Sequence, residues 1–170
     1  TARWLAEVKD RFFSAEAGNP LLQVHLESFH RREAPFYQAS NWRGRREQDG
    51  GLLYGPFLAE VQLLLTLFGQ ATPTGAHFHN RLLSGITEIE DGGQVLMAGP
   101  GGEAISLSYS TATGEPTPAR QLRLIGTEGE LCLAGPQFQA VRHNSLGAEI
   151  APPEAADAAS GAAFRDRLDA

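Results

Sequence analysis

The sequence has little cysteine and no long hydrophobic run, and both absences limit what it can be. Its single cysteine, Cys132, excludes an intramolecular disulfide and a metal site built from several thiolates. No apolar stretch reaches the roughly 18 residues of a membrane span, and the first residues are amphipathic rather than a signal peptide. The net charge of −6 argues against nucleic-acid binding. We expect a soluble, cytoplasmic protein with neither membrane nor nucleic acid as a partner.

Length and composition predict one globular domain. The chain has 170 residues, of which 42% are hydrophobic and 20% charged, an ordinary balance for a folded protein. Periodic patterns run through residues 1–146, which we expect to form an α+β domain. Residues 147–170 are rich in alanine and proline, and we expect a loop followed by a short C-terminal helix.

Two helices are expected before most of the strands. Residues 2–17 place their apolar side chains on one helical stripe. A second helix is expected from Pro56 to Phe68, because proline suits the first helical position and Gly69 suits the end. This helix is apolar nearly all round, which predicts burial. Residues 30–51 are polar and broken by Pro35 and Gly44, so we expect an irregular segment there.

Alternating apolar and polar residues predict short strands over most of the remaining chain. The expected strands cover residues 20–29, 75–83, 86–90, 94–98, 104–109, 120–125, 130–133 and 138–143. Together these patterns predict an α+β fold with an open-faced, mostly antiparallel sheet and helices packed on one face. The other face is polar, with His25 and Arg123 among its residues, and could meet water, a ligand or another subunit.

Two segments resemble a known family. One runs through Asn41-Trp42-Arg43 and Gly50-Gly51-Leu52-Leu53-Tyr54-Gly55-Pro56 into the apolar helix, and the other is the run Leu-Arg-Leu-Ile-Gly-Thr-Glu-Gly-Glu-Leu at 122–131. From about residue 3 to 146, the chain resembles the C-terminal domain of the Gfo/Idh/MocA oxidoreductases. The resemblance implies a domain that completes the pocket for sugars or polyols and forms oligomers through its sheet. Complete members also have an NAD(P)-binding Rossmann domain.

The sequence departs from the family pattern in two ways. The Rossmann half is missing: residues 99–104 formally fit G-x-G-x-x-A, but a strand follows them, so we interpret them as a hairpin turn. The family's helix also opens with an Asp and, four residues later, a His. Gly55 and Ala59 occupy those positions, and neither can transfer a proton. We therefore expect no cofactor on this chain alone, and NAD(P) only with a Rossmann half or a Rossmann-bearing partner.

Three residues are candidates for proton transfer. Tyr54 and Glu60 flank the positions that lost the Asp and His. Tyr54 could act as an acid or anchor a ligand, and Glu60 could act as a base if desolvated. Ordinary helix packing explains both equally well. His30 is the third candidate.

Six residues are candidates for substrate binding. The arginine group at 31–46, from which we single out Arg31 and Arg43, could hold a phosphate or carboxylate together with Tyr37 and Trp42. A solvated loop is the alternative, while the resemblance implies that Trp42 and Arg43 lie near the mouth of the substrate pocket.

The remaining two candidates are His77 and His79, which share one face of a strand. With His25 and Glu27 on a neighbouring strand they could bind zinc. A polar sheet face at a subunit interface explains them more simply, so we expect no metal.

Three hypotheses for function remain. The chain could be part of a longer sugar oxidoreductase, or a non-catalytic subunit that pairs through its sheet with itself or with a Rossmann-bearing partner. It could also be a repurposed enzyme that performs cofactor-independent isomerisation, cyclisation or elimination on a small molecule. We favour a substrate-side and oligomerisation domain of a sugar-oxidoreductase-like protein that is catalytically incompetent on its own.

Overall fold

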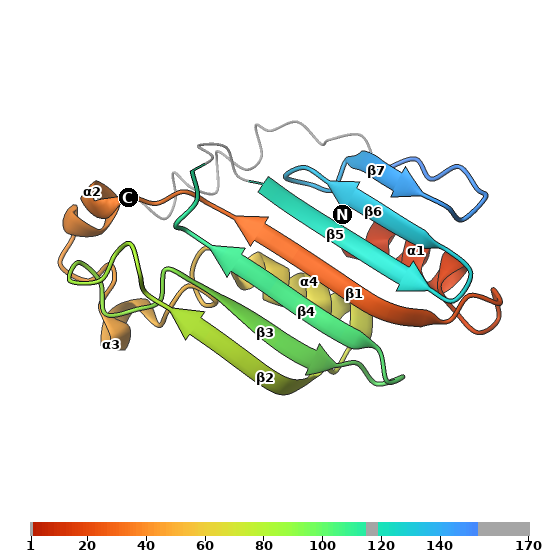
Figure 1. Ribbon diagram of the computed structural model, residues 1–170, viewed down its shortest axis with the longest axis horizontal. Helices are drawn as coiled ribbons and strands as arrows, with labels where there is room; N and C mark the ends of the chain where they lie inside the picture. The colour runs from red at the N-terminus through yellow and green to blue at the C-terminus, as the bar shows by residue number, and fades with distance from the viewer. Residues whose placement is uncertain (1, 115–118, 153–170) are drawn as a thin grey trace.

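A computed structural model describes residues 2–114 and 119–152. One seven-stranded sheet forms the front layer in Figure 1, and helices α1 (Ala2–Phe12) and α4 (Leu58–Phe68) lie behind it. Two short helices, α2 (Ala34–Gln38) and α3 (Arg46–Asp49), lie beyond one end of the sheet. The prediction of an α+β fold with helices on one face of an open sheet is therefore confirmed.

The strands occur in the spatial order β2-β3-β4-β1-β5-β6-β7. Their bounds are β1 (Leu21–Phe29), β2 (Thr72–His79), β3 (Gly92–Ala98), β4 (Ala104–Ser110), β5 (Ala119–Gly126), β6 (Glu130–Ala134) and β7 (Ala140–Asn144). The pairing of β1 with β4 is parallel and the other pairs are antiparallel. The first strand in the sequence thus occupies the middle of the sheet.

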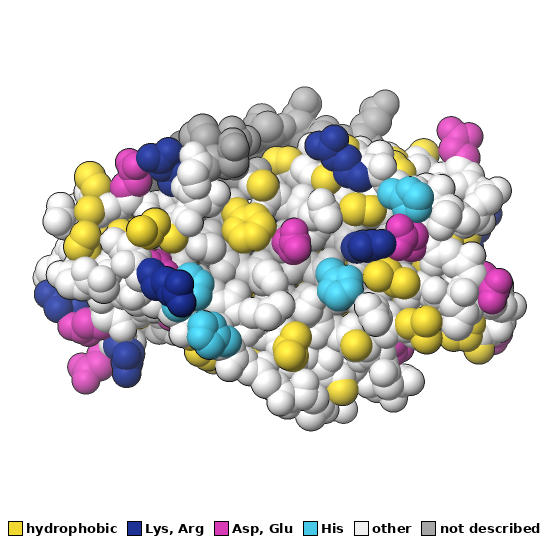
Figure 2. Space-filling view, in the orientation of Figure 1, with side chains coloured by type: hydrophobic (Ala, Val, Ile, Leu, Met, Phe, Trp, Pro, Cys, Tyr) yellow, Lys and Arg dark blue, Asp and Glu magenta, His cyan; other side chains and the backbone are white. Residues whose placement is uncertain are grey.

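Alternation along each strand separates the core from the open face. Val24 and Leu26 of β1 are fully buried against the helices, as is Leu124 of β5, which pairs with Val24. His25, between Val24 and Leu26, and Glu27, which follows Leu26, point to the open face. Removing apolar surface from water at about 25 cal/mol per Å² stabilises this arrangement. Figure 2 shows the open face, where histidines and both signs of charge are scattered among uncharged groups.

Several local predictions were wrong. The first helix ends at Phe12 rather than at residue 17. The side chain of Asn19 donates a hydrogen bond to the carbonyl of Phe12 (2.9 Å) at this end of the helix. Residues 86–90 form turns instead of a strand, and residues 30–51 include the helices α2 and α3. Helix α4 is not wholly buried, since Leu58 and Leu65 are 40% and 49% exposed.

Two further expectations concern membrane-spanning helices and the C-terminal residues. Within residues 2–114 and 119–152, no helix is long and apolar enough to cross a membrane. The expected C-terminal helix, at residues 162–170, lies outside the described residues.

Candidate functional site

The connecting segments gather at one end of the sheet, which we call the loop end. Strands β1, β2 and β4 finish there, and β3 and β5 begin there (Figure 1). Helices α2 and α3 and the segment 80–91 all lie at this end. Because several loops converge on a rigid sheet, the loop end is the natural place for a binding site.

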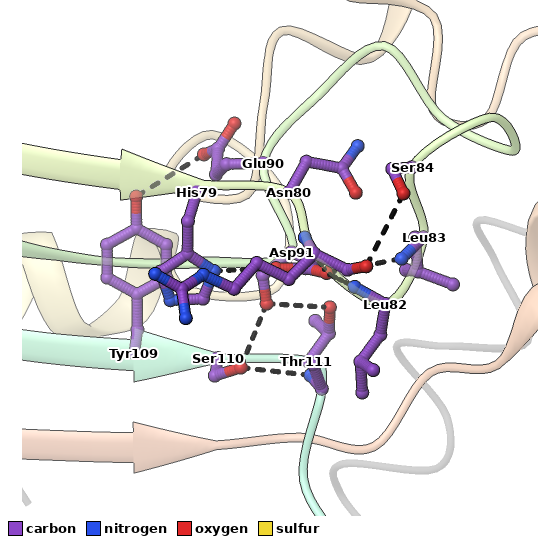
Figure 3. A network of polar contacts seen from close by, with 12 residues as sticks. His79, Asn80, Leu82, Leu83, Ser84, Glu90, Asp91, Tyr109, Ser110 and Thr111 are labelled. Carbon is purple, nitrogen blue, oxygen red and sulfur yellow. Dashed lines mark hydrogen bonds and ion pairs between the residues drawn. The ribbon is translucent and has the colours of Figure 1, made fainter.

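Asp91 organises the segment 80–91 from within (Figure 3). Its side chain is fully buried and accepts hydrogen bonds from the amides of Arg81 (2.8 Å), Leu82 (2.6 Å) and Leu83 (3.2 Å). Its second oxygen lies 2.8 Å from Nδ1 of His79. Burial alone would raise the pKa of Asp91, but the Leu82 amide, the His79 ring and the other two amides outweigh it and lower the pKa. The ionised carboxylate thus fixes the loop to β2.

Glu90 and Tyr109 form a second buried contact at this end (Figure 3). Oε1 of Glu90 accepts a hydrogen bond from the Leu52 amide (2.9 Å) and one from the Tyr109 hydroxyl (3.3 Å). Burial and the negative charge of Glu90 raise the pKa of Tyr109. The phenol therefore keeps its proton and acts as a donor. Gly51 passes so close that a Cβ there would lie 3.1 Å from Oε2 of Glu90.

A pocket of about 350 Å³ opens beside Glu90. Its lining includes Gly51, His79, Asn80 and Glu90. Asn80 donates hydrogen bonds to the carbonyls of Thr87 (3.1 Å) and Ile89 (2.7 Å), which holds the amide in place. The pocket thus presents a carboxylate and an imidazole, groups that can exchange hydrogen bonds with the hydroxyls of a small molecule.

Two consecutive glycines at the start of β3 allow close packing at the loop end. Gly92 and Gly93 belong to β3. A Cβ on Gly92 would lie 2.7 Å from Cε1 of His79, and a Cβ on Gly93 would lie 2.7 Å from the Phe78 ring. Without side chains of their own, these glycines allow β2 side chains to lie across β3.

The predicted arginine and aromatic group assembles around Phe36, a residue that the sequence analysis did not single out. The guanidinium carbons of Arg32 and Arg43 lie 4.3 Å and 4.4 Å from the centre of the Phe36 ring. Tyr37 packs edge-on against the same ring, with centres 5.1 Å apart, and burial raises its pKa. Trp42 is 46% exposed, and its ring centre lies 5.5 Å from the Arg43 guanidinium.

Arg31, by contrast, turns away from this group. Its guanidinium pairs with Glu33 and donates to the carbonyl of Gly114 (3.4 Å). Arg32, a member of the same predicted arginine group, occupies the place beside Phe36. Only the geometry separates the two neighbouring arginines, since both belong to the same polar run.

The three proton-transfer candidates do not share one surface. Tyr54 is 78% exposed, whereas Glu60 is 1% exposed and lies beneath the sheet. The Glu60 carboxylate accepts a hydrogen bond from Ser28 (2.6 Å) and faces Nε of Arg120 at 2.9 Å. The His30 ring packs edge-on against Phe57, with ring centres 5.2 Å apart. Glu60 is therefore part of a buried ion pair.

The histidine pair lies at the loop end of the open face. The rings of His77 and His79 are 6.2 Å apart. Strands β3 and β4 separate them from His25, so the neighbouring strands needed for the zinc arrangement do not occur. Within the described residues, no group of three or more His, Cys, Asp or Glu side chains could hold a metal ion.

The positions that lost the Asp and His lie just before and within the first turn of α4. Gly55 and Ala59 are both exposed. The nearest side-chain oxygen to Gly55 is Oδ1 of Asp49, 3.8 Å from where a Cβ would lie. The helix therefore opens with an accessible surface that carries no imidazole at residue 59 and no carboxylate at residue 55.

Solved dehydrogenases share this fold. The chain is similar to the WlbA dehydrogenase from Bordetella pertussis in complex with NADH and UDP-GlcNAcA, with 20% identity and a TM-score of 0.70 over 98% of this chain and 45% of that chain. It is also similar to the WlbA dehydrogenase from Chromobacterium violaceum, with 23% identity and a TM-score of 0.69. That match covers 98% of this chain and 48% of the dehydrogenase. A levoglucosan dehydrogenase in complex with NADH matches at 13% identity and a TM-score of 0.65. That match covers 82% of this chain and 39% of the dehydrogenase.

These matches define which part of a dehydrogenase the chain corresponds to. It spans less than half the length of each of these three dehydrogenases, so the shared fold is that of one part of each of those chains. No curated protein matches the chain. The family comparison matches residues 6–132, which confirms the resemblance found in the sequence. The chain belongs to the GFO/IDH/MocA C-terminal domain family.

Proposed function

We propose that this chain is the substrate-side and oligomerisation domain of a sugar-oxidoreductase-like protein and that it does not transfer hydride on its own. The surface at the start of α4 carries the proposal. Gly55 and Ala59 are exposed there, so the site is open but lacks the groups that would move a proton with the hydride. NAD(P) would enter only with a Rossmann half or a Rossmann-bearing partner.

The pocket beside Glu90 gives this domain a means of holding a sugar. The carboxylate can accept hydrogen bonds from two adjacent hydroxyls, and the ring of His79 lines the same pocket. Tyr109 and the Leu52 amide hold one Glu90 oxygen at 3.3 Å and 2.9 Å, which orients the other. The similar dehydrogenases were solved with UDP-GlcNAcA or levoglucosan, and both ligands carry sugar hydroxyls.

The open face of the sheet supports the assembly part of the proposal. Glu130 pairs with Arg123 and with His143 (3.2 Å) on this face, and His25 lies beside Arg123 in the register. Positive and negative groups lie close together, so the face can complement a second copy of itself. A homo-oligomer or a complex with a Rossmann-bearing partner would cover it.

Binding and turnover measurements on the isolated chain test the proposal. We expect no NADH binding by fluorescence titration and no NADH formation with UDP-GlcNAcA or levoglucosan. We expect weak binding of one of these sugars by calorimetry, reduced about tenfold by Glu90→Gln through the loss of a charged hydrogen bond. Glu16→Gln, an exposed change of the same kind in the turn that follows α1, should leave binding unchanged.

Two results would contradict the proposal. NADH formation by the chain alone would show that it is catalytically competent. Turnover of a sugar without any nucleotide would instead favour the repurposed, cofactor-independent enzyme.

A further inference from the structure

Two guanidinium groups share one aromatic ring at the loop end. Arg32 and Arg43 both stack on Phe36, at 4.3 Å and 4.4 Å from its centre. Within residues 2–114 and 119–152, neither arginine has a carboxylate within ion-pair distance, whereas Arg31 pairs with Glu33 and Arg45 with Glu88 (2.7 Å). Two neighbouring positive charges are therefore left without a direct counter-charge.

The surrounding contacts hold this pair in place. Nη1 of Arg43 donates to the carbonyl of Phe36 (3.4 Å), and cation–π attraction keeps both groups against the ring. Asp49 is the acid that acts on Arg32 through space, and one of its oxygens is already bound by the amide of Gly44 (2.6 Å). Burial, together with the charge of Arg43, lowers the pKa of Arg32. A bound anion would relieve this electrostatic cost.

Space for such an anion lies beside the ring. A pocket of about 520 Å³ is lined by Arg31, Arg32, Glu33, Pro35 and Phe36. Glu33 neutralises Arg31, so Arg32 is the cation that this pocket offers to a ligand. Arg43 and Trp42 lie outside this lining, and Arg43 adjoins it through its contact with the Phe36 ring.

We propose that Arg32 and Arg43, both stacked on Phe36, bind a phosphate group of the sugar ligand. Guanidinium forms paired hydrogen bonds with phosphate oxygens, and arginine stacked on an aromatic ring loses little freedom when it does so. The inference rests on the proposed function, since it names the substrate class as a phosphate-bearing sugar. The Glu90 pocket would take hydroxyls and the arginine pair the phosphate.

Calorimetry with inorganic pyrophosphate, UDP and uridine tests the site. We expect pyrophosphate and UDP to bind, uridine to bind much more weakly, and affinity to fall as salt rises. Arg32→Gln and Arg43→Gln should each weaken pyrophosphate and UDP about tenfold, because each removes a charge-assisted contact. Arg45→Gln is the matched control, since Arg45 pairs with Glu88, and it should change affinity by less than about twofold.

The outcomes separate the two proposals. Unchanged pyrophosphate and UDP affinity in both variants, or no binding by the original chain, would overturn the arginine site. Binding of UDP supports a phosphate ester as the ligand, whereas binding of pyrophosphate without binding of UDP would contradict it. Binding of pyrophosphate without binding of any sugar would reject the proposed function and leave the anion site standing. If Arg43→Gln unfolds, Arg43→Lys keeps the charge and should still lose affinity, because lysine lacks the paired donors.

Discussion

Replacing Asp91 by asparagine is expected to lower the free energy of unfolding by about 3 kcal/mol, among the larger effects of a single substitution. The buried carboxylate accepts three amide hydrogen bonds and contacts the His79 ring. Asparagine has nearly the same shape, but its NH₂ group is a donor placed where the protein also supplies donors. Urea unfolding at neutral pH measures the loss.

The dependence of stability on acidic pH should report on the same carboxylate. The native pKa of Asp91 is below its ordinary value. Its stabilising contribution is therefore complete above the unfolded value near 4 and is lost as the pH falls through the lower native value. The stability of the original chain should fall more steeply in that range than that of the Asp91→Asn variant. Equal slopes of the free energy of unfolding against pH in the two chains would contradict this role of Asp91.

A matched control separates this effect from a simple change in net charge. Asp10 lies on α1 with a side chain that is 71% exposed. Asp10→Asn should alter the free energy of unfolding by less than about 0.5 kcal/mol.

The buried pair of Glu60 and Arg120 should produce a comparable effect. Glu60→Leu leaves Arg120 beneath the sheet without its counter-charge, and we expect a loss of about 3–5 kcal/mol. Ser28, which donates to Glu60 at 2.6 Å, would also lose its partner. Arg120→Met should be similarly costly, because it leaves the charge of Glu60 uncompensated.

The double variant distinguishes an ion pair from ordinary packing. Glu60→Leu with Arg120→Met removes both charges, so it should be clearly more stable than the sum of the single losses predicts. The same cycle at Arg3 and Glu7, an exposed pair with side chains 94% and 63% accessible, should give a coupling below about 1 kcal/mol. Additive losses at Glu60 and Arg120 would contradict direct coupling.

Much of the fold could be predicted because its signals are local. Alternation at Val24 and Leu26 shows which side of β1 is buried, and Gly69 marks the end of α4. The order of strands could not be predicted, since it depends on pairing between distant segments. That order places β3 and β4 between His25 and His77.

The candidate site was predicted less completely. Arg43 and Trp42 were singled out because they share a short polar and aromatic run, and their role in binding stays a prediction. Asp91 and Glu60 are buried acids, and no periodic pattern distinguishes a buried acid from a solvated one. Asp91 also precedes two glycines, and the sequence alone does not show that these glycines serve close packing in β3.

The central position of β1 determines when the sheet can form during synthesis. Its parallel neighbour begins at Ala104 and its antiparallel neighbour at Ala119, so both edges of β1 stay open while residues 30–103 are made. At about 5–20 residues per second, that interval lasts roughly 4–15 s. A ribosome-bound chain at that stage offers two unpaired edges of an apolar strand. Nascent chains stalled before β5 should therefore engage holdase chaperones more strongly than chains released after Gly126.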